Sequence, residues 1–337
     1  MTTDKKTTVV FGATGTLGTY LVDELVESKC PVFAVGGRHL NRAYYVAKGI
    51  GCAAVNVVTG EGFEHLPMEN VSAVVQIAGA MPSRMVGYKP KVYLDVNITG
   101  TLNVLEYCRR VGASVYLFTQ SHSDVAAYWN TNKLINADAP RAINYKGDHA
   151  VYIISKNAAV DLIEHYHQDY GIRTVTLRLP TIYCLTPMRE MYVNGEKRPI
   201  AYLRLIDLAM RGEPIEVWGD PTIKKDIVYV KDFNQMVARA MACENAQGMY
   251  NVGTGIGTSL EEQIRGIVDV FSPKHNPSKI ILRPDKPSQS GYLYDISKAT
   301  RDFGYLPKHN YLSALRDMKL EMQGHRFDHL EGKDVTI

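Results

Sequence analysis

The most restrictive feature of the sequence is a glycine-rich turn between an expected strand and an expected helix. Residues Thr7–Phe11 form an apolar run of strand length, and Thr16–Ser28 repeats leucine and valine at helical spacing. In such a turn the first glycine bends the chain, the second brings backbone close to a pyrophosphate, and the third packs helix against strand. The helix N-terminus adds free N–H groups for phosphates. The sequence therefore predicts a dinucleotide site formed by Gly12, Thr14, Gly15, Thr16, Leu17 and Gly18.

Short apolar strands alternate with helices throughout the first half of the chain. Strands that are apolar on both faces and separated by helices indicate a parallel sheet covered on both sides. The predicted fold class is α/β, a doubly wound parallel Rossmann sheet with a smaller C-terminal α+β substrate domain. The further expected strands are Pro31–Val35, Ala53–Val57, Ala73–Ile77, Val115–Phe118 and Arg173–Leu179, and the further expected helices are Val92–Val111 and Tyr152–Tyr170.

The pattern becomes less regular after Pro180. Helices are expected at Ala201–Arg211, Ser259–Phe271 and Tyr311–Gln323, and the residues at 187–199 are charged and rich in turn formers. We therefore expect a dinucleotide-binding domain over residues 1–183, with about 223–256 returning to it. A mainly substrate-binding cap follows over 184–325, and residues 326–337 form a polar tail.

Composition excludes several classes of protein. A net charge of +3 over 337 residues is too small and balanced for bulk attraction to nucleic acid. No stretch reaches the roughly 18 apolar residues of a membrane helix, and no signal peptide is evident. The five cysteines are widely spaced without a CxxC pair, which argues against disulfides and structural zinc. We expect a cytoplasmic protein without a metal site.

The end of the second strand bears on the choice of cofactor. An NAD site usually places Asp or Glu there for the ribose 2′-hydroxyl. This chain has Val35-Gly36-Gly37-Arg38 instead. A guanidinium suits a 2′-phosphate through charge-assisted hydrogen bonds. NADP(H) is therefore favoured, and NAD(H) is the alternative if Arg38 is only a solvated charge.

A tyrosine and a lysine four residues apart begin the helix before the sixth strand. Tyr152 and Lys156 share a helix face, and a cation beside a phenol makes proton transfer near neutral pH easier. Tyr-xxx-Lys occurs three times in the chain, but only this pair follows the fifth strand. That strand ends in Thr119-Gln-Ser121-His-Ser123, whose hydroxyls could hold a substrate oxygen near the phenol. A surface pair on a helix is the less favoured interpretation.

Together these motifs resemble the extended short-chain dehydrogenases/reductases, also called the NAD-dependent epimerase/dehydratase family, and in particular the nucleotide-sugar-modifying branch. The resemblance covers nearly the whole chain. It rests on the glycine turn and Tyr152/Lys156, and on Ile77-Ala-Gly-Ala80, Asp95-Val-Asn97-Ile-Thr-Gly-Thr101, Arg178-Leu-Pro180-Thr-Ile-Tyr183, Asp226-Ile-Val-Tyr-Val-Lys-Asp232, Tyr250-Asn-Val-Gly-Thr-Gly255 and Phe303-Gly-Tyr-Leu-Pro307.

The resemblance implies roles for individual residues. Tyr152 would be the acid/base, Lys156 would bind the nicotinamide ribose and lower the phenol pKa, and Ser121 would orient the substrate. Asn97 would support the relay. Ala78, Gly79 and Pro180 would line the cofactor.

The substrate-binding residues implied by the resemblance include departures from the family pattern. Arg283 matches an arginine that grips the substrate diphosphate, whereas Lys225 stands where a second arginine is usual. Ser123 becomes the working hydroxyl if the alignment slips. The Asp-Glu pair of sugar-nucleotide dehydratases is replaced by His122 and Ser123, which disfavours elimination of water.

The leading expectation is a nucleotide-sugar 4-ketoreductase that uses NADP(H) and moves hydride at a carbinol carbon. A nucleotide-sugar 4-epimerase with retained cofactor is the first alternative. A reductase of small apolar carbonyl compounds and a non-catalytic NADP-binding protein are the others. The expected partners are a nucleotide sugar and a second copy of the chain, with no nucleic acid and no membrane.

Overall fold

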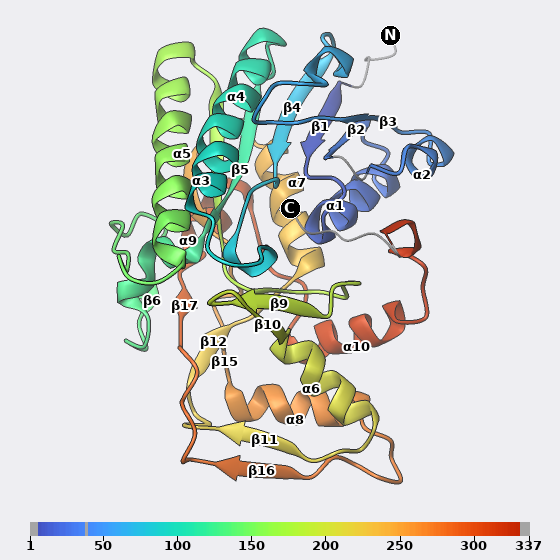
Figure 1. Ribbon diagram of the computed structural model, residues 1–337, viewed down its shortest axis with the longest axis vertical. Helices are drawn as coiled ribbons and strands as arrows, with labels where there is room; N and C mark the ends of the chain where they lie inside the picture. The colour runs from blue at the N-terminus through green and yellow to red at the C-terminus, as the bar shows by residue number, and fades with distance from the viewer. Residues whose placement is uncertain (1–5, 38–39, 331–337) are drawn as a thin grey trace.

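Seven parallel strands form the central sheet of the computed structural model, in the order β14-β7-β5-β4-β1-β2-β3 (Figure 1). The structure describes residues 6–37 and 40–330. The strand order reverses between β1 and β4, as in a doubly wound sheet, so the predicted fold class is confirmed. The strands are β1 (Thr7–Phe11), β2 (Val32–Gly36), β3 (Gly51–Ala54), β4 (Val71–Gln76), β5 (Val115–Ser121), β7 (Arg173–Leu179) and β14 (Gly248–Asn251).

Helices cover both faces of this sheet, and successive strand residues alternate between two cores. In β1, Val10 packs in one core, whereas Val9 and Phe11 pack in the other. The first core lies against α1 (Thr16–Glu27), α2 (Arg42–Ala47), α7 (Val230–Ala242) and α9 (Ser297–Phe303). The second core lies against α4 (Gly100–Arg110) and α5 (His149–Tyr170).

The helix expected at Val92–Val111 is not a single α-helix. It consists of α3 (Pro90–Leu94), a π-helical turn η3 (Asp95–Thr99) and α4. Single π turns inside helices are frequent at functional sites. Here the turn contains Asn97, whose side chain is buried.

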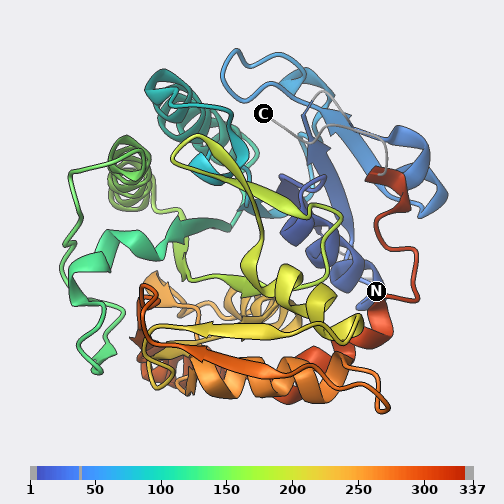
Figure 2. The ribbon, with the colours of Figure 1, turned by 60° about the horizontal axis from the view of Figure 1, so that its bottom comes forward.

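A third core lies below the sheet in Figure 1, next to the glycine turn, and it includes Tyr20 of α1 with Leu17 packed against it. Helices α6 (Ala201–Met210), α8 (Leu260–Phe271) and α10 (Tyr311–Glu321) pack there with the paired strands β11 (Ile215–Trp218) and β16 (Ile280–Arg283) (Figures 1 and 2). Four more two-stranded pairs complete the described strands: β6 (Leu134–Ile135) with β17 (Leu293–Tyr294), β8 (Ile182–Tyr183) with β13 (Val228–Tyr229), β9 (Glu190–Val193) with β10 (Glu196–Pro199), and β12 (Lys224–Asp226) with β15 (Gly257–Ser259). The 3₁₀ turns are η1 (Phe63–His65), η2 (Pro82–Arg84), η4 (His122–Tyr128) and η5 (Asp328–Leu330).

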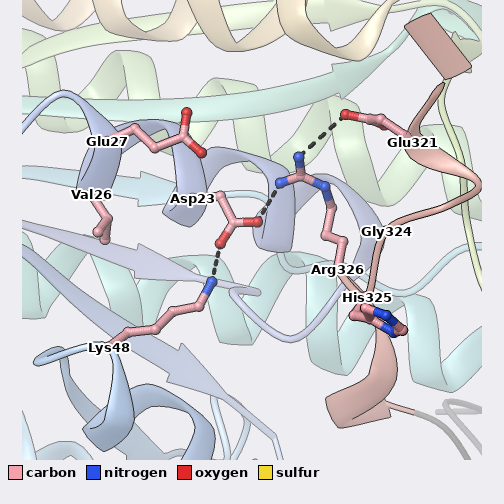
Figure 3. A pocket seen from close by; sticks show the side chains of 8 residues that line it. All are labelled: Asp23, Val26, Glu27, Lys48, Glu321, Gly324, His325 and Arg326. Carbon is pink, nitrogen blue, oxygen red and sulfur yellow. Dashed lines mark hydrogen bonds and ion pairs between the residues drawn. The ribbon is translucent and has the colours of Figure 1, made fainter.

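Residues 325–330 of the C-terminal segment pack against the dinucleotide-binding domain. Asp23 on α1 forms ion pairs with both Lys48 and Arg326, and Arg326 also reaches Glu321 at 3.2 Å (Figure 3). Phe327 and Leu330, which the sequence assigns to a polar tail, are buried. This end of the chain therefore connects α10 to the sheet domain. Within the described residues no helix combines the length and apolarity needed to span a bilayer.

Candidate active site

The glycine turn has the shape that phosphate binding requires. Gly12 adopts φ +94°, and a Cβ there would lie 2.6 Å from the backbone nitrogen of Ala78. A Cβ on Gly18 would lie 2.0 Å from the carbonyl oxygen of Gly12. Because real Cβ atoms do not approach other atoms this closely, both positions require glycine. They bring β1, β4 and the start of α1 into direct contact.

The start of α1 is open to an anion. Gly15 is the N-cap and makes no side-chain cap hydrogen bond, and the first turn of this fully described helix contains no acidic residue. The N–H groups of Thr16, Leu17 and Gly18 therefore have no acidic competitor on their own helix, and Thr14 borders them. The residues present fit the pyrophosphate of a nicotinamide dinucleotide. Thr16 Oγ1 lies 2.9 Å from Thr186 Oγ1, so the segment after β8 closes over this turn.

The adenosine end of the site is only partly described. β2 ends at Gly36, next to Gly37, and no carboxylate occurs at this strand end. Arg38, the residue expected to bind a 2′-phosphate, lies outside the described residues.

The segment after β4 is tied to the π turn by Asn97. Asn97 Oδ1 accepts from the Ala80 N–H at 2.8 Å, and its Nδ2 donates to the Ala80 carbonyl at 3.0 Å. The same Nδ2 donates to Ser155 Oγ at 3.0 Å. Ser155 in turn donates to the Tyr152 carbonyl at 2.7 Å. Asn97 therefore links the expected cofactor-lining residues Ala78 and Gly79 to the helix that carries Tyr152.

Tyr152, Lys156 and Ser121 lie around one point at the carboxyl edge of the sheet. A Cβ built on Gly79 would be 3.8 Å from Lys156 Nζ and 3.2 Å from Asn97 Oδ1. Lys156 Nζ also lies 3.7 Å from the centre of the Phe118 ring. The Ser121 side chain is placed to donate a hydrogen bond to the phenol of Tyr152, in the sense that favours the phenolate. Pro180, buried directly after β7, lies at the same edge.

Ser121 occupies the hydroxyl position in this arrangement. Its Oγ accepts a hydrogen bond from the Ser123 N–H at 3.3 Å and so caps η4. Ser121, rather than Ser123, is the serine that acts on the phenol of Tyr152. The geometry thus favours Ser121 as the substrate-facing hydroxyl.

Burial perturbs the two titrating groups of the site in opposite directions. It raises the pKa of Tyr152 to about 12, although the hydrogen bond from Ser121 acts in the lowering sense. It lowers the pKa of Lys156 to about 7. A catalytic phenol must release its proton more easily than this, so the site needs additional positive charge. The cationic form of Lys156 and a bound oxidised nicotinamide would both act in that direction.

The lowered Lys156 pKa predicts a pH dependence of stability in the cofactor-free protein. Between pH 7.5 and 9.5 the unfolded lysine stays protonated while the folded one loses its proton, so the unfolded state binds more protons. The free energy of unfolding should therefore rise with pH across this window because of Lys156. Urea unfolding of wild type and Lys156→Met measures the difference, since other titrating groups contribute equally to both. A difference between the two proteins that does not change with pH would contradict the lowered pKa.

A histidine and a cluster of aromatic rings border the hydroxyl side of the site. His122 Nδ1 lies 2.8 Å from the Tyr294 hydroxyl, and its ring centre is 4.8 Å from that of Tyr292. Burial lowers the pKa of His122 to about 3, and the positive charge of Lys225 contributes in the same direction. His122 is therefore neutral at physiological pH. Lys225 Nζ lies 5.8 Å from the Tyr292 ring centre, which places this lysine on the same side of the site.

Arg283 has a different environment from the one that the sequence suggests. Its Nη1 lies 2.6 Å from Glu216 Oε1, and its Nε lies 3.1 Å from Asp285 Oδ1. Two carboxylates thus balance its charge. Trp218, which lies opposite Arg283 in the pairing of β11 with β16, is half-exposed. A diphosphate would have to displace at least one of these carboxylates.

Sequence reasoning missed several residues that shape the site. Ser155 lies between Tyr152 and Lys156, and the Tyr-xxx-Lys motif assigns no role to this position. The contact of Thr186 with Thr16 could not be predicted because the two residues are 170 positions apart in the sequence. Asp124, directly after the serine segment, forms a buried ion pair with Arg178 on β7. Only the position of Asp124 beside the hydroxyl cluster could have indicated that role.

Comparisons with known proteins agree with this geometry. Residues 8–253 match the model of the family described as the NAD dependent epimerase/dehydratase family. UDP-glucuronic acid decarboxylase 3 of Arabidopsis thaliana is 25% identical over 309 residues, covering 89% of this chain and 84% of that protein. A putative UDP-glucose 4-epimerase of Methanocaldococcus jannaschii is 26% identical over 254 residues, covering 75% and 79%.

Solved structures share the fold at lower identity. The UDP-glucose 4-epimerase of Thermus thermophilus in complex with NAD superimposes with a TM-score of 0.72 at 21% identity, covering 94% of this chain and 99% of that one. The UDP-N-acetylglucosamine 4-epimerase of Methanobrevibacter ruminantium gives a TM-score of 0.74 at 17% identity, with coverage of 94% and 99%. The family model spans most of the chain and includes both the glycine turn and Tyr152/Lys156. The protein is therefore an enzyme that uses a nicotinamide dinucleotide, and it belongs to the NAD dependent epimerase/dehydratase family.

Proposed function

We propose that the protein is a nucleotide-sugar 4-epimerase that keeps its cofactor through the reaction. The observation that carries this proposal is the grouping of Ser121 and Tyr152 with Lys156, next to the cofactor-lining segment Ala78–Gly79. Relatives named as acting on UDP-sugars support the substrate class. The proposal also assigns the roles of Asn97 and of the glycine turn given above.

The chemistry assigned to the chain is proton transfer at a sugar hydroxyl. When bound, a nicotinamide dinucleotide would supply the acceptor and donor of hydride. Tyr152 removes the proton from the hydroxyl as the carbon is oxidised, and Ser121 holds that oxygen in place. Lys156 lowers the cost of the phenolate through its positive charge. Inversion requires reduction from the opposite face, so Tyr152 must then return the proton to the same oxygen.

Lys225 supports a substrate with a diphosphate. Its ammonium group is largely buried, and the burial lowers its pKa. No carboxylate among the described residues forms an ion pair with it, whereas Arg283 has two. We therefore assign the diphosphate to Lys225 first and to Arg283 second.

A 4-ketoreductase is the second candidate, and one observation favours it. β2 ends in two glycines without the acid that selects NAD, which suits NADP(H). A reductase exchanges its cofactor at every turnover and consumes NADPH. In this candidate a preference for NADP(H) therefore goes together with a reduction that consumes NADPH.

The two candidates differ in what they consume. Incubating the protein with UDP-glucose, UDP-N-acetylglucosamine or UDP-glucuronic acid and catalytic NAD⁺ should yield the 4-epimer, identified by the C4 proton couplings in NMR. A product that forms only with stoichiometric NADPH and a 4-keto substrate would instead establish the reductase. Absence of either product from all of these sugars would exclude UDP-sugars of these three types as substrates.

We also propose a homodimer formed through α4 and α5. Leu102 on α4 and Ile154 on α5 are 38% and 42% exposed, although most apolar residues of these helices are buried. Apolar side chains on adjacent helices are suited to packing against a second copy.

A further inference from the structure

Arg84 lies at the end of η2, just after the cofactor-lining segment, in surroundings that do not balance its charge. Among the described residues its side chain forms one hydrogen bond, from Nη1 to the thioether sulphur of Met188 at 2.9 Å. Its neighbours Cys184 and Tyr202 are neutral near physiological pH, because burial raises the pKa of both side chains. Burial lowers the pKa of Arg84, and no carboxylate of residues 6–37 or 40–330 contributes to its environment. A thioether is a weak acceptor, so most of its five N–H donors lack a strong partner.

Two other arginines, both on β7, have different partners, and of these Arg178 is buried and Arg173 is partly buried. Arg178 donates from Nε and Nη2 to Asp124 and from Nη1 to Asn251. Arg173 donates from Nη1 and Nη2 to the carbonyl oxygens of Ala240, Ala246 and Met241. Both have strong acceptors within the protein. Arg84 therefore departs from the pattern that this chain itself follows for buried guanidinium groups.

A partly buried arginine whose charge is not balanced lowers the stability of the folded protein. Arginine remains protonated in proteins, so partial burial withdraws a full charge from water without compensation. A bound ligand of opposite charge would neutralise such a guanidinium. Guanidinium groups form strong hydrogen bonds with planar or tetrahedral oxyanions.

The neighbours of Arg84 identify the oxyanion. Met188 donates its N–H to Thr186 Oγ1 at 3.3 Å, and Thr186 Oγ1 lies 2.9 Å from Thr16 Oγ1 in the glycine turn. On its other side, η2 continues directly from Ala78–Ala80. η2 also packs against β9. Arg84 thus lies between two segments that border the dinucleotide site, and phosphoryl groups are the anions expected there.

We propose that Arg84 binds a phosphoryl oxyanion of a nucleotide bound in the active site. The source is either the pyrophosphate of the dinucleotide or the diphosphate of the nucleotide sugar. Only the second source rests on the function proposed above. This role adds a binding residue to the site that neither the glycine turn nor the catalytic pair supplies.

Calorimetric titrations of Arg84→Met and Arg84→Lys test the proposal. ADP-ribose probes the first source, and UDP added to protein saturated with NAD⁺ probes the second. Losing a charge-assisted bond should weaken one of these ligands about 10- to 100-fold in Arg84→Met, with partial recovery in Arg84→Lys. Neither titration requires turnover, so a failure of the proposed epimerase activity would leave the ADP-ribose result interpretable.

The stability of the ligand-free protein separates binding from packing. Arg84→Met removes a buried charge beside Met188, so its melting temperature should equal or exceed that of wild type. The matched control Arg173→Met loses three backbone hydrogen bonds, and it should melt lower with its ADP-ribose affinity unchanged. Weakened ADP-ribose assigns Arg84 to the cofactor, and weakened UDP assigns it to the substrate. Unchanged affinity for both ligands in Arg84→Met would overturn the proposal.

Discussion

Replacing Tyr152 by phenylalanine is expected to lower kcat by about 10²- to 10⁴-fold, the range associated with loss of a general acid/base. Tyr152 lies beside Ser121, and Lys156 lies one helical turn away on the same helix. Phenylalanine keeps the ring and its edge-on contact with Tyr93 at 5.9 Å between centres. The fold and the dinucleotide affinity should therefore be retained while the proton transfer is lost.

The chain offers a matched control for this variant in a second Tyr-xxx-Lys pair. Tyr44 stacks on His329 at 3.6 Å, and its partner Lys48 forms an ion pair with Asp23 away from the catalytic residues. Tyr44→Phe should leave kcat unchanged within about twofold. Steady-state rates with the UDP-sugar that gives product, together with fluorescence titration of NAD⁺, measure both quantities. Equal kcat values for Tyr152→Phe and wild type would remove Tyr152 from the chemistry.

Replacing Asp124 by alanine is expected to lower the free energy of unfolding by about 3–5 kcal/mol, as for other buried ion pairs that lose one partner. Arg178 Nε lies 2.9 Å from Asp124 Oδ1, and Arg178 Nη2 lies 3.0 Å from Asp124 Oδ2. The Arg178 and Asp124 side chains are only 2% and 0% exposed. Without the carboxylate, a guanidinium remains buried beside β7.

Asp161→Ala is the control for this second variant. Asp161 pairs with Arg141 on the surface, where its side chain is 67% exposed, and exposed pairs contribute about 0–1 kcal/mol. Urea unfolding followed by circular dichroism compares the two variants. Asp124→Ala should also lose activity, because Asp124 lies in η4, which Ser121 caps. A loss of stability in Asp124→Ala no larger than in Asp161→Ala would contradict the structural role assigned to the pair.

Local patterns were enough to predict the sheet domain. β1 and β7 have the bounds that the sequence predicts, and α1 ends one residue earlier than expected. The π turn was missed because its distortion depends on the bonds of Asn97 to Ala80 and Ser155 across space. The seventh strand was missed as well. β14 has only four residues, and its pairing with β7 spans about 70 residues of sequence.

The hairpin of β9 and β10 could have been predicted from the sequence of its turn. Residues 187–199 read as a charged, turn-rich stretch, yet Asn194 and Gly195 both adopt positive φ between two paired strands. Asn-Gly is the preferred sequence for such a two-residue turn.

The charged residues of the candidate site were the hardest to interpret from sequence. Tyr152, Lys156 and Ser121 could be assigned to one edge of the sheet because spacing and strand order determine where they lie, and their roles stay predictions. The environments of Arg283 and Arg84 depend on distant residues, Glu216 in one case and Met188 in the other. A motif match identifies a charged side chain but does not reveal whether the folded protein already neutralises it.

The fate of the hydrogen on C4 of the sugar tests the central claim most directly. UDP-sugar labelled with deuterium at C4 should give a 4-epimer that retains the label in wild type, with no net change in the dinucleotide. Mass spectrometry of the product in unlabelled water measures this retention. Full retention in wild type, with product from Tyr152→Phe formed about 10²- to 10⁴-fold more slowly, is the predicted result. Loss of the label to solvent, or its appearance in released cofactor, would contradict an epimerase that keeps its cofactor.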